Sequence, residues 1–497
     1  MRIDIQNKAE LQEYLQQIKT LAEQSKLVCT KYIDLGTSII RVLCYTSKIV
    51  SFMEKQLTYT LRDDADHYDS TFVVWDTGNT GDAIKAVSAG FSLQQKTRMR
   101  LESLMEKREY PSHLLFMDNN FSTINPVIVI NSIGGFVEAY DTANKTCYYG
   151  IEDFAPEEFI KLGHVFVQQI NVLIQNSSVN LAHGAIIGFN NNGLLMCARG
   201  QRGKSTLTVH AMMHGFEYVS DDYQILENKN GQLLSYPIYS IITLSPTMYN
   251  ELYDDLKGKF VSNNARKDKY VINIADYHDQ FRKAYPIRLC LFPEIVSDPE
   301  PSIKFCTSKE KGRAIVQLIQ STVMQMRDLN NHAVIKKMFD MVKDMDFYKF
   351  NLCRNIAGNT EYLRQFLKDF DFNTRKGIPT DKIMVDITFD LANILDSETS
   401  TIYSMNKFAT NVYENLLKGV DTEEIWHKLA PMTAENENLR KEFDTLIQVI
   451  NNRGFIQDGI DVPENIDINP DFAAECGYKL SVWEYGDKET IDLINTK

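Results

Sequence analysis

One stretch, residues 192–215, constrains the fold of this chain more than any other. It opens with an Asn-Gly turn and a short apolar run at residues 194–197, which predicts a buried strand. A loop with two glycines follows over residues 198–203, and Lys204-Ser205-Thr206 then leads into an apolar helical segment that ends near Gly215. Strand, glycine loop, Gly-Lys-Ser and helix in this order are the context of a phosphate-binding loop.

The residue types in this loop fit the chemistry of a bound polyphosphate. Backbone N–H groups at a helix N-terminus converge on an anion, and the helix dipole adds to the attraction. Glycine lets the backbone approach the ligand closely, lysine reaches the β and γ phosphates, and the serine hydroxyl binds Mg²⁺. The sequence therefore predicts a site for ATP and Mg²⁺, with nucleotide-binding residues Gly200, Gln201, Arg202, Gly203, Lys204, Ser205 and Thr206.

The first position of the motif departs from the usual pattern. Glycine is expected there, and this chain has Ala198. Alanine resists a positive φ, so the substitution predicts a reshaped loop or weaker nucleotide binding.

Two acidic residues follow the helix at the end of a second apolar run, residues 216–219. Asp221 and Asp222 are adjacent, and successive side chains of a strand point to opposite sides. One carboxylate is then free to hold Mg²⁺ while the other takes a proton from an attacking hydroxyl. A turn or helix-cap pair is the alternative reading of these acids, and a structural role is the alternative for His183, which opens the strand before the turn.

Together these spacings resemble the catalytic domain of HPr kinase/phosphorylase and its relatives, serine kinases with a phosphoenolpyruvate-carboxykinase-like fold. In that family a His-Gly pair precedes the phosphate loop and a double aspartate follows it, as His183-Gly184 and Asp221-Asp222 do here. The resemblance implies that His183 lies near the phosphates and that Lys204 serves the nucleotide. It also implies that Asp221 is the general base and that Ser205 and Asp222 serve the metal. It extends more loosely over residues 31–370.

Composition excludes several other classes of protein. The 497 residues suffice for two or three domains, and a hydrophobic content of 44% predicts real cores. A net charge of −13 argues against nucleic acid as a partner. The 8 cysteines include no Cys-x-x-Cys pair, so neither a zinc site nor a disulfide framework is indicated. Because no apolar signal region and no run of about eighteen apolar residues occurs, we expect no membrane span and a cytoplasmic location.

Local patterns divide the chain into segments. We expect an N-terminal helix over residues 1–30, an N-terminal α/β part over 31–175, a P-loop catalytic domain with a mixed sheet over 176–372 and a linker over 373–380. Short strands near residues 382–388, 392–395 and 401–404 precede helices near 406–417, 422–429 and 434–453, which fits a small winged-helix domain over 381–457. An acidic tail over 458–497 closes the chain, with a strand candidate at 478–485. The fold class is therefore α/β (α+β).

The C-terminal segment resembles the PqqD-like family, which recognises the leader peptides of ribosomally made, modified peptides. The residues that carry the resemblance are Tyr403-Ser404-Met405-Asn406, Val412-Tyr413, Leu416-Leu417-Lys418-Gly419 and Arg453-Gly454-Phe455-Ile456. Members of that family add a peptide as a strand to an exposed sheet edge beside a helix. The implied peptide-binding residues are Thr401, Ile402, Tyr403 and Ser404 at the edge, with Val449 and Arg453 on the groove wall. A domain that only packs on the kinase, or that dimerises, is the alternative.

These features predict an ATP-dependent kinase that phosphorylates a Ser or Thr hydroxyl, on a precursor peptide held by the C-terminal domain. Two alternatives remain: a non-catalytic nucleotide- or peptide-binding scaffold, and a small-molecule kinase of related fold.

Overall fold

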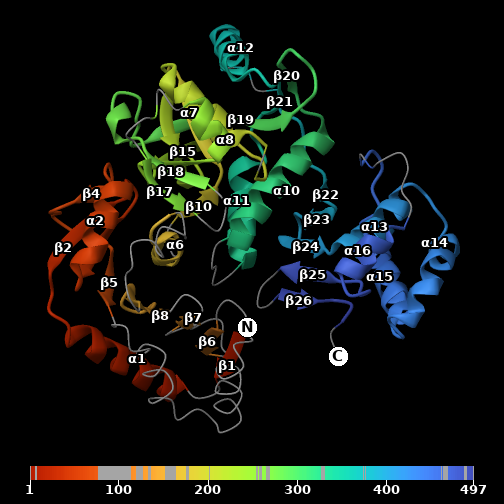
Figure 1. Ribbon diagram of the computed structural model, residues 1–497, viewed down its shortest axis with the longest axis horizontal. Helices are drawn as coiled ribbons and strands as arrows, with labels where there is room; N and C mark the ends of the chain where they lie inside the picture. The colour runs from red at the N-terminus through yellow and green to blue at the C-terminus, as the bar shows by residue number, and fades with distance from the viewer. Residues whose placement is uncertain are drawn as a thin grey trace.

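The protein has a mixed α/β architecture in which the two nine-stranded sheets combine parallel and antiparallel strand pairs (Figure 1). The computed structural model describes residues 2–5, 8–76, 114–118, 127–131, 136–151, 164–174, 178–200, 202–252, 256, 260–264, 269–325, 331–372, 374, 376–460, 462, 468–485 and 490–495. In this part of the chain, no helix has both the length and the apolar character that a membrane crossing requires.

The first sheet contains the N-terminal strands and is covered by α1, which packs on β5 and on β7, β8 and β9. In sheet order its strands are β1 (Arg2–Ile5), β6 (Leu114–Asp118), β7 (Val127–Asn131), β8 (Phe136–Asp141), β9 (Thr146–Ile151), β5 (Ser70–Asp76), β3 (Ile39–Cys44), β2 (Cys29–Asp34) and β4 (Leu61–Arg62). The helices of this region are α1 (Lys8–Glu23), α2 (Ser47–Gln56) and α6 (Val167–Ile174).

The N-terminus differs from the helix expected over residues 1–30. Residues 2–5 form β1, which pairs in parallel with β6, and the helix begins only at Lys8. Leu15 and Ile18 are buried against the sheet, whereas Leu21 is exposed. The first residues are therefore outside the helix, because they find a strand partner far along the chain.

The second sheet carries the glycine loop that precedes Lys204. Its strands run in the order β10 (Val179–His183), β14 (Tyr223–Lys229), β15 (Gln232–Pro237), β19 (Tyr285–Ile295), β12 (Asn192–Met196), β11 (Ala185–Phe189) and β13 (Glu217–Ser220), and β21 (Phe347–Leu352) joins β19 to β20 (Ser302–Phe305). A smaller sheet of β16 (Ile241–Leu244), β18 (Lys269–Asn273) and β17 (Phe260–Asn264) lies beside it. The helices here are α7 (Lys204–Met213), α8 (Pro246–Glu251), η2 (Ala275–Tyr277), α10 (Ser308–Gln325), α11 (Asn331–Val342) and α12 (Ile356–Asp369).

Residues 383–495 form what we call the C-terminal unit, a sheet backed by helices. Its strands run in the order β22 (Ile383–Thr388), β23 (Leu391–Asp396), β24 (Thr401–Met405), β25 (Val482–Tyr485) and β26 (Thr490–Asp492). Its helices are α13 (Lys407–Leu417), α14 (Thr422–Leu429), η3 (Ala430–Ala434), α15 (Leu439–Arg453) and α16 (Pro470–Glu475). The helix expected over 434–453 begins later, at Leu439, because Ala434 ends η3 and residues 435–438 turn the chain before α15.

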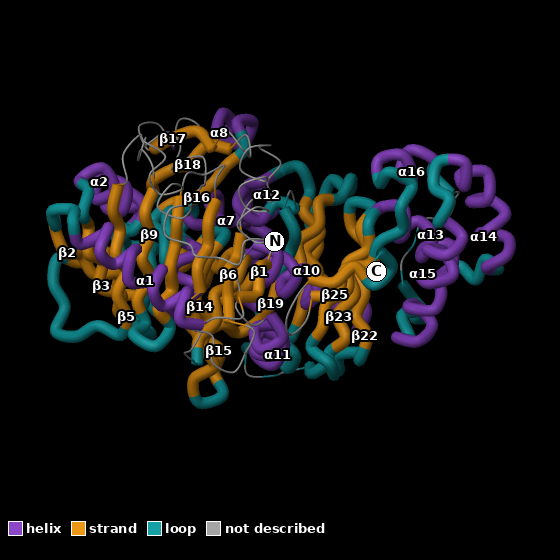
Figure 2. Tube along the Cα trace, turned by 90° about the horizontal axis from the view of Figure 1, so that it is seen from below, coloured by secondary structure: helices purple, strands orange, loops and turns teal. Residues whose placement is uncertain are grey.

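The C-terminal unit packs directly on the rest of the protein. Its strands lie against α10, and helices α13–α16 lie on the far side of them (Figure 2). Met384, Leu395 and Ile402 belong to the same apolar core as α10, α11 and β19. Because the core continues across this junction, the geometry of the C-terminal sheet is coupled to that of the glycine-loop region.

Candidate active site

The glycine loop, of which residues 197–200, 202 and 203 are described, connects β12 to α7 in the order that the sequence predicts. Strand β12 lies between β11 and β19, and its parallel register with β19 places Met196 opposite Leu291. The hydrogen bond from Cys197 N to Leu291 O, 2.9 Å, extends this pairing to the start of the loop. Because β12 is hydrogen-bonded to a strand on each side, the position where the loop begins is fixed. Helix α7 begins at Lys204, immediately after the loop.

The two described glycines of the loop have different reasons to be glycine. Gly203 has φ 86°, and a Cβ on it would lie 2.7 Å from Leu352 Cδ1 on β21. Gly200 has no described atom within 4 Å of such a Cβ, so its face of the loop is open. Ala198 is not among the residues with positive φ. Alanine at this position therefore carries no positive-φ strain, and weaker nucleotide binding stays a prediction.

Lys204 crosses the loop that precedes it. Its Nζ donates to the carbonyl of Ala198 and to the carbonyl of Arg199, the latter at 3.1 Å. The side chain is 5% exposed. Burial lowers the pKa of Lys204, while the nearby carboxylates of Asp222 and Asp221 act in the opposite direction. The ammonium thus belongs to the same buried electrostatic cluster as the acid pair.

Asp221 and Asp222 follow β13, and both side chains reach Thr243 on β16. Thr243 N donates to Asp221 Oδ2 at 3.4 Å, and Thr243 Oγ1 donates to Asp222 Oδ2 at 3.0 Å. The sequence interpretation, in which the two carboxylates point to different sides, is wrong. Asp222 has φ 67°, which turns the chain out of the extended conformation in which neighbouring side chains alternate.

The environments of the two carboxylates displace their pKa values in opposite directions. Burial and the negative charge of Asp222 raise the pKa of Asp221 to about 7, with Lys269 and the Ser205 hydroxyl opposing the shift. Burial alone would raise the pKa of Asp222, but the neighbouring His183 side chain and the charge of Lys269 hold that pKa well below its usual value. Two neighbouring carboxyl groups with pKa values shifted in opposite directions are the pattern of a general base beside a permanently ionised carboxylate.

His183 and Lys269 complete the cluster from two other strands. His183 Nε2 lies 3.7 Å from Asp222 Oδ1, and its backbone N donates to Thr322 Oγ1 on α10 at 2.9 Å. Lys269 Nζ donates to Thr243 Oγ1 at 3.4 Å. Lys269 is one of several cations in a basic stretch of the sequence, residues 257–269, and Thr243 lies within an apolar strand, so neither has a local sequence signal for this site.

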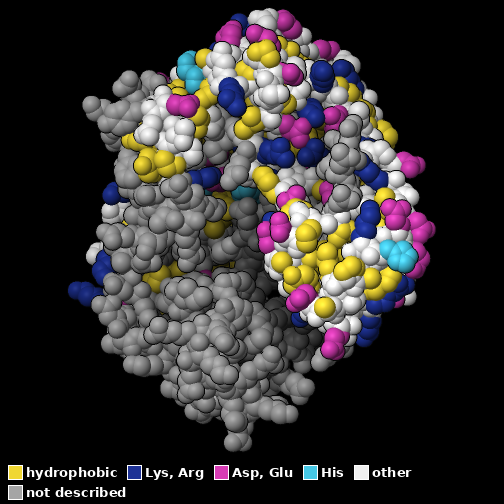
Figure 3. Space-filling view, turned by 45° about the vertical axis from the view of Figure 1, so that its right-hand side comes forward, with side chains coloured by type: hydrophobic (Ala, Val, Ile, Leu, Met, Phe, Trp, Pro, Cys, Tyr) yellow, Lys and Arg dark blue, Asp and Glu magenta, His cyan; other side chains and the backbone are white. Residues whose placement is uncertain are grey.

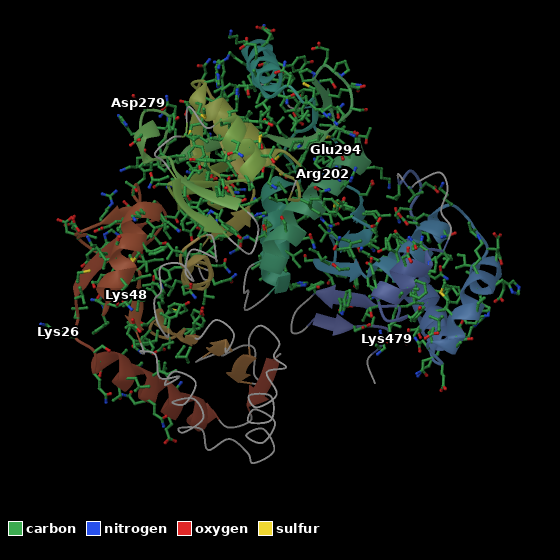
Figure 4. All side chains as sticks on the ribbon, viewed as in Figure 1. Lys26, Lys48, Arg202, Asp279, Glu294 and Lys479 are labelled. Atoms are coloured by element: carbon green, nitrogen blue, oxygen red, sulfur yellow. The ribbon has the colours of Figure 1, made fainter. Side chains whose placement is uncertain are left out.

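The remaining described candidate residues of the loop lie at or near the start of α7. Ser205 and Thr206 are half-buried in the first turn of α7, and the Ser205 hydroxyl interacts with Asp221. Arg202 lies beside Glu294 on β19 (Figure 4) and holds its guanidinium 5.6 Å from the ring of Phe389. Gln201 lies outside the described residues. So do four further basic-stretch residues, Lys257, Lys259, Arg266 and Lys267.

The donor set around Ser205 fits a hard divalent cation only when phosphates complete it. Among the described residues, no group of three or more His, Cys, Asp or Glu side chains is arranged to hold a metal. Mg²⁺ needs no such group, because it is usually bound by one or two carboxylates together with substrate phosphates and water. Asp221 Oδ1 is buried and has no hydrogen-bond partner in the described part of the chain. An unpaired buried carboxylate oxygen is costly, so this site suits an incoming cation or donor.

The sheet edge expected at residues 401–404 is not exposed. Strand β24 pairs with β23 on one side and with β25 on the other, where Ile402 lies opposite Tyr485 and Ser404 opposite Trp483. All four strand residues, Thr401, Ile402, Tyr403 and Ser404, are buried. The tail of the same chain supplies the extra strand, which the sequence did not reveal because nothing local specifies its partner.

Val449 and Arg453 lie on α15 beside this sheet. Val449 is half-buried against the core of the C-terminal unit. Arg453 is exposed, and its Nη2 lies 3.2 Å from Glu484 Oε2 on β25, with the guanidinium 5.3 Å from the ring of Tyr403. The residues predicted as groove wall and those predicted as sheet edge therefore lie close together, but β25 is paired to that edge.

No protein-family model and no curated protein matches the sequence. The solved structures that match include the Hpr(Ser) kinase/phosphatase from Coxiella burnetii, with 14% identity and a TM-score of 0.22. This likeness covers 38% of the present chain and 97% of that protein.

Proposed function

We propose that this chain is an ATP-dependent kinase that phosphorylates a Ser or Thr hydroxyl. One observation carries the proposal. Lys204, at the start of α7, is buried together with Asp221, whose pKa is raised, and Asp222, whose pKa is lowered, directly beside an open glycine loop. A cation, an ionised carboxylate and a base poised near neutral pH are what transfer of a phosphoryl group to a hydroxyl requires.

In this proposal ATP lies on residues 200–206. The amides of the loop and of the first turn of α7 contact the phosphates, and Lys204 turns from the loop carbonyls toward the β and γ phosphates. Ser205 and Asp222 would hold Mg²⁺, which when bound would neutralise charge on the phosphates. Lys269 and His183 add positive character from β18 and β10, and the low pKa of Asp222 keeps that carboxylate ionised throughout.

Asp221 is the general base. Its carboxylate takes the proton of the acceptor hydroxyl while the hydroxyl oxygen forms a bond to the γ phosphorus. The bond from phosphorus to the bridging oxygen breaks, and ADP leaves with that electron pair. Asp221 Oδ1 supports this role, because it is buried beside the loop and has no partner among the described residues.

We further propose that the acceptor hydroxyl belongs to a precursor peptide recognised by the C-terminal unit. In this division the catalytic domain spans residues 176–372 and the PqqD-like recognition domain spans 381–457. Strand addition along residues 401–404 requires displacement of β25, because β25 now pairs with that edge. The area of apolar side chains on this unit (Figure 3) supports an interaction role, since exposed apolar area often marks a binding surface.

A transfer assay with the full-length protein tests the proposal. The protein is incubated with γ-labelled ATP and Mg²⁺, and with either a degenerate peptide library containing one Ser or Thr, or free serine. We expect label on the peptides. Label on free serine alone would indicate a small-molecule kinase, and calorimetric binding of ATP without any transfer would indicate a scaffold.

A further inference from the structure

A buried network joins the glycine loop to the C-terminal sheet. Arg199, the second residue of the loop motif, places its Nε 3.3 Å from Asp386 Oδ2 on β22. Its Nη1 donates to the carbonyl of Thr388 at 3.2 Å, and its backbone N donates to Gln317 Oε1 on α10 at 3.0 Å. Main chain and side chain of one loop residue are thus both attached to this junction.

Asp386 is the centre of the network. It is 0% exposed, and its Oδ1 accepts from Gln317 Nε2 at 2.8 Å, from Thr388 Oγ1 at 2.7 Å and from Arg313 Nε at 3.1 Å. A carboxylate removed from water in this way contributes little net stability even when it is paired. Its charge is better explained by the arginine that it orients than by the packing of the sheet.

The contacts run on from Arg199 to the ligand-binding lysine. Lys204 Nζ donates to the carbonyls of Ala198 and Arg199, so the position of Arg199 sets where the ammonium lies. The turn between β22 and β23 also reaches the loop, because Arg202 holds its guanidinium 5.6 Å from the Phe389 ring. Phe389 and Asp390 both have positive φ, 55° and 60°, and Phe389 is 52% exposed. Positive φ at both central residues is the conformation of a two-residue hairpin turn, here between β22 and β23.

We propose that Asp386 is a positioning residue of the glycine loop, which acts through Arg199 and makes the C-terminal unit a structural part of the nucleotide site. This inference rests on the proposed function. Under this proposal the affinity of the loop for nucleotide depends on a side chain of the C-terminal unit, in addition to the role of that unit in binding an acceptor peptide.

Asp386→Asn in the full-length protein tests the proposal, with Asp396→Asn as a matched control. Asp396 is also buried in this sheet, but its Oδ1 accepts from the backbone N–H groups of Glu398 and Thr399 instead of facing the loop. We expect Asp386→Asn to raise the Kd for Mg·ATP by about tenfold, the scale of coupling between residues in contact. Asp396→Asn is expected to leave this Kd unchanged, whatever its effect on the Tm.

A double-mutant cycle with Arg199→Gln separates positioning from general destabilisation. If Asp386 acts through Arg199, the double variant binds Mg·ATP no more weakly than the weaker-binding of the two single variants. Losses that add in full, or an Asp386→Asn variant with wild-type affinity, would overturn the inference.

Amide hydrogen exchange of residues 197–203 in the ligand-free protein gives a readout that does not depend on nucleotide. Faster exchange in Asp386→Asn, and not in Asp396→Asn, is expected; equal exchange contradicts positioning. If the wild-type protein fails to bind Mg·ATP, the proposed function fails, and the exchange rates alone then decide whether Asp386 orders the loop.

Discussion

Asp221 and Asp222 are neighbours in the chain, both carboxylates reach Thr243, and their pKa values are displaced in opposite directions. The difference arises because burial and the adjacent negative charge raise the pKa of Asp221, whereas the neighbouring His183 side chain and the charge of Lys269 lower that of Asp222. A base and a permanent anion are thereby built from two identical side chains.

The pH dependence of transfer follows from the pKa of Asp221, about 7. The base is protonated below that value, so kcat/KM is expected to rise about tenfold per pH unit on the acid side and to level off above about pH 7. A kcat/KM profile measured between about pH 5.5 and pH 9 checks this. A profile that is flat across neutrality would exclude Asp221 as the base.

Gly203 and Gly200 form a matched pair for the loop. Gly203→Ala places a Cβ against Leu352 at a positive φ, so we expect a loss of about 1–3 kcal/mol of stability together with weakened ATP binding. Gly200→Ala has space for its Cβ, so the Tm is expected to stay unchanged while ATP affinity falls about tenfold. Thermal melts and calorimetry distinguish these outcomes. Wild-type affinity for ATP in Gly200→Ala would show that ATP does not contact the Gly200 face of the loop.

Thr243→Val retains the shape of the side chain and removes the hydroxyl shared by Asp222 and Lys269. One buried carboxylate oxygen loses its partner, which costs about 1–3 kcal/mol of stability. We expect transfer to slow by about 10- to 100-fold with little change in the Kd for ATP, because geometry at the acids is disturbed and the loop is not. Single-turnover kinetics beside calorimetry test this, and unchanged transfer would make Thr243 a packing residue only.

Ala198→Gly addresses the departure from the usual motif. Because Ala198 does not have a positive φ, glycine relieves no strain there. The variant is expected to bind ATP with unchanged affinity and to lose about 0.4–1 kcal/mol of stability through the greater freedom of its unfolded chain. A marked gain in affinity would show that alanine does impair the loop.

The sequence predicted the elements around the loop well because their signals are local. The strand before the loop, the helix that begins at Lys204 and the order of strands and helices near residues 382–453 follow from apolar spacing, glycine and capping residues. The conformation of Asp222 was not predictable in this way. A positive φ at aspartate depends on the hydrogen bond between its carbonyl and Gly184 N and on Thr243, which only the folded chain supplies.

Long-range pairing accounts for the other differences. Strand β25 was foreseen as a strand near residues 478–485, but its partner, β24, was not, so an occupied edge was read as exposed. The contact between Arg199 and Asp386 likewise joins residues far apart in sequence, and neither belongs to a motif that predicts the other. Such contacts are determined by the packing of whole elements, for which a single sequence carries no local signal.

Phosphoryl transfer and ATP binding, measured side by side for the wild-type protein, Lys204→Ala and Asp221→Asn, decide whether this site is a kinase active site. We expect the wild-type protein to label Ser/Thr peptides from γ-labelled ATP and Lys204→Ala to lose ATP binding. Asp221→Asn should bind ATP normally and transfer at least about 100-fold more slowly. Full transfer activity in both variants would contradict the assignment of this site.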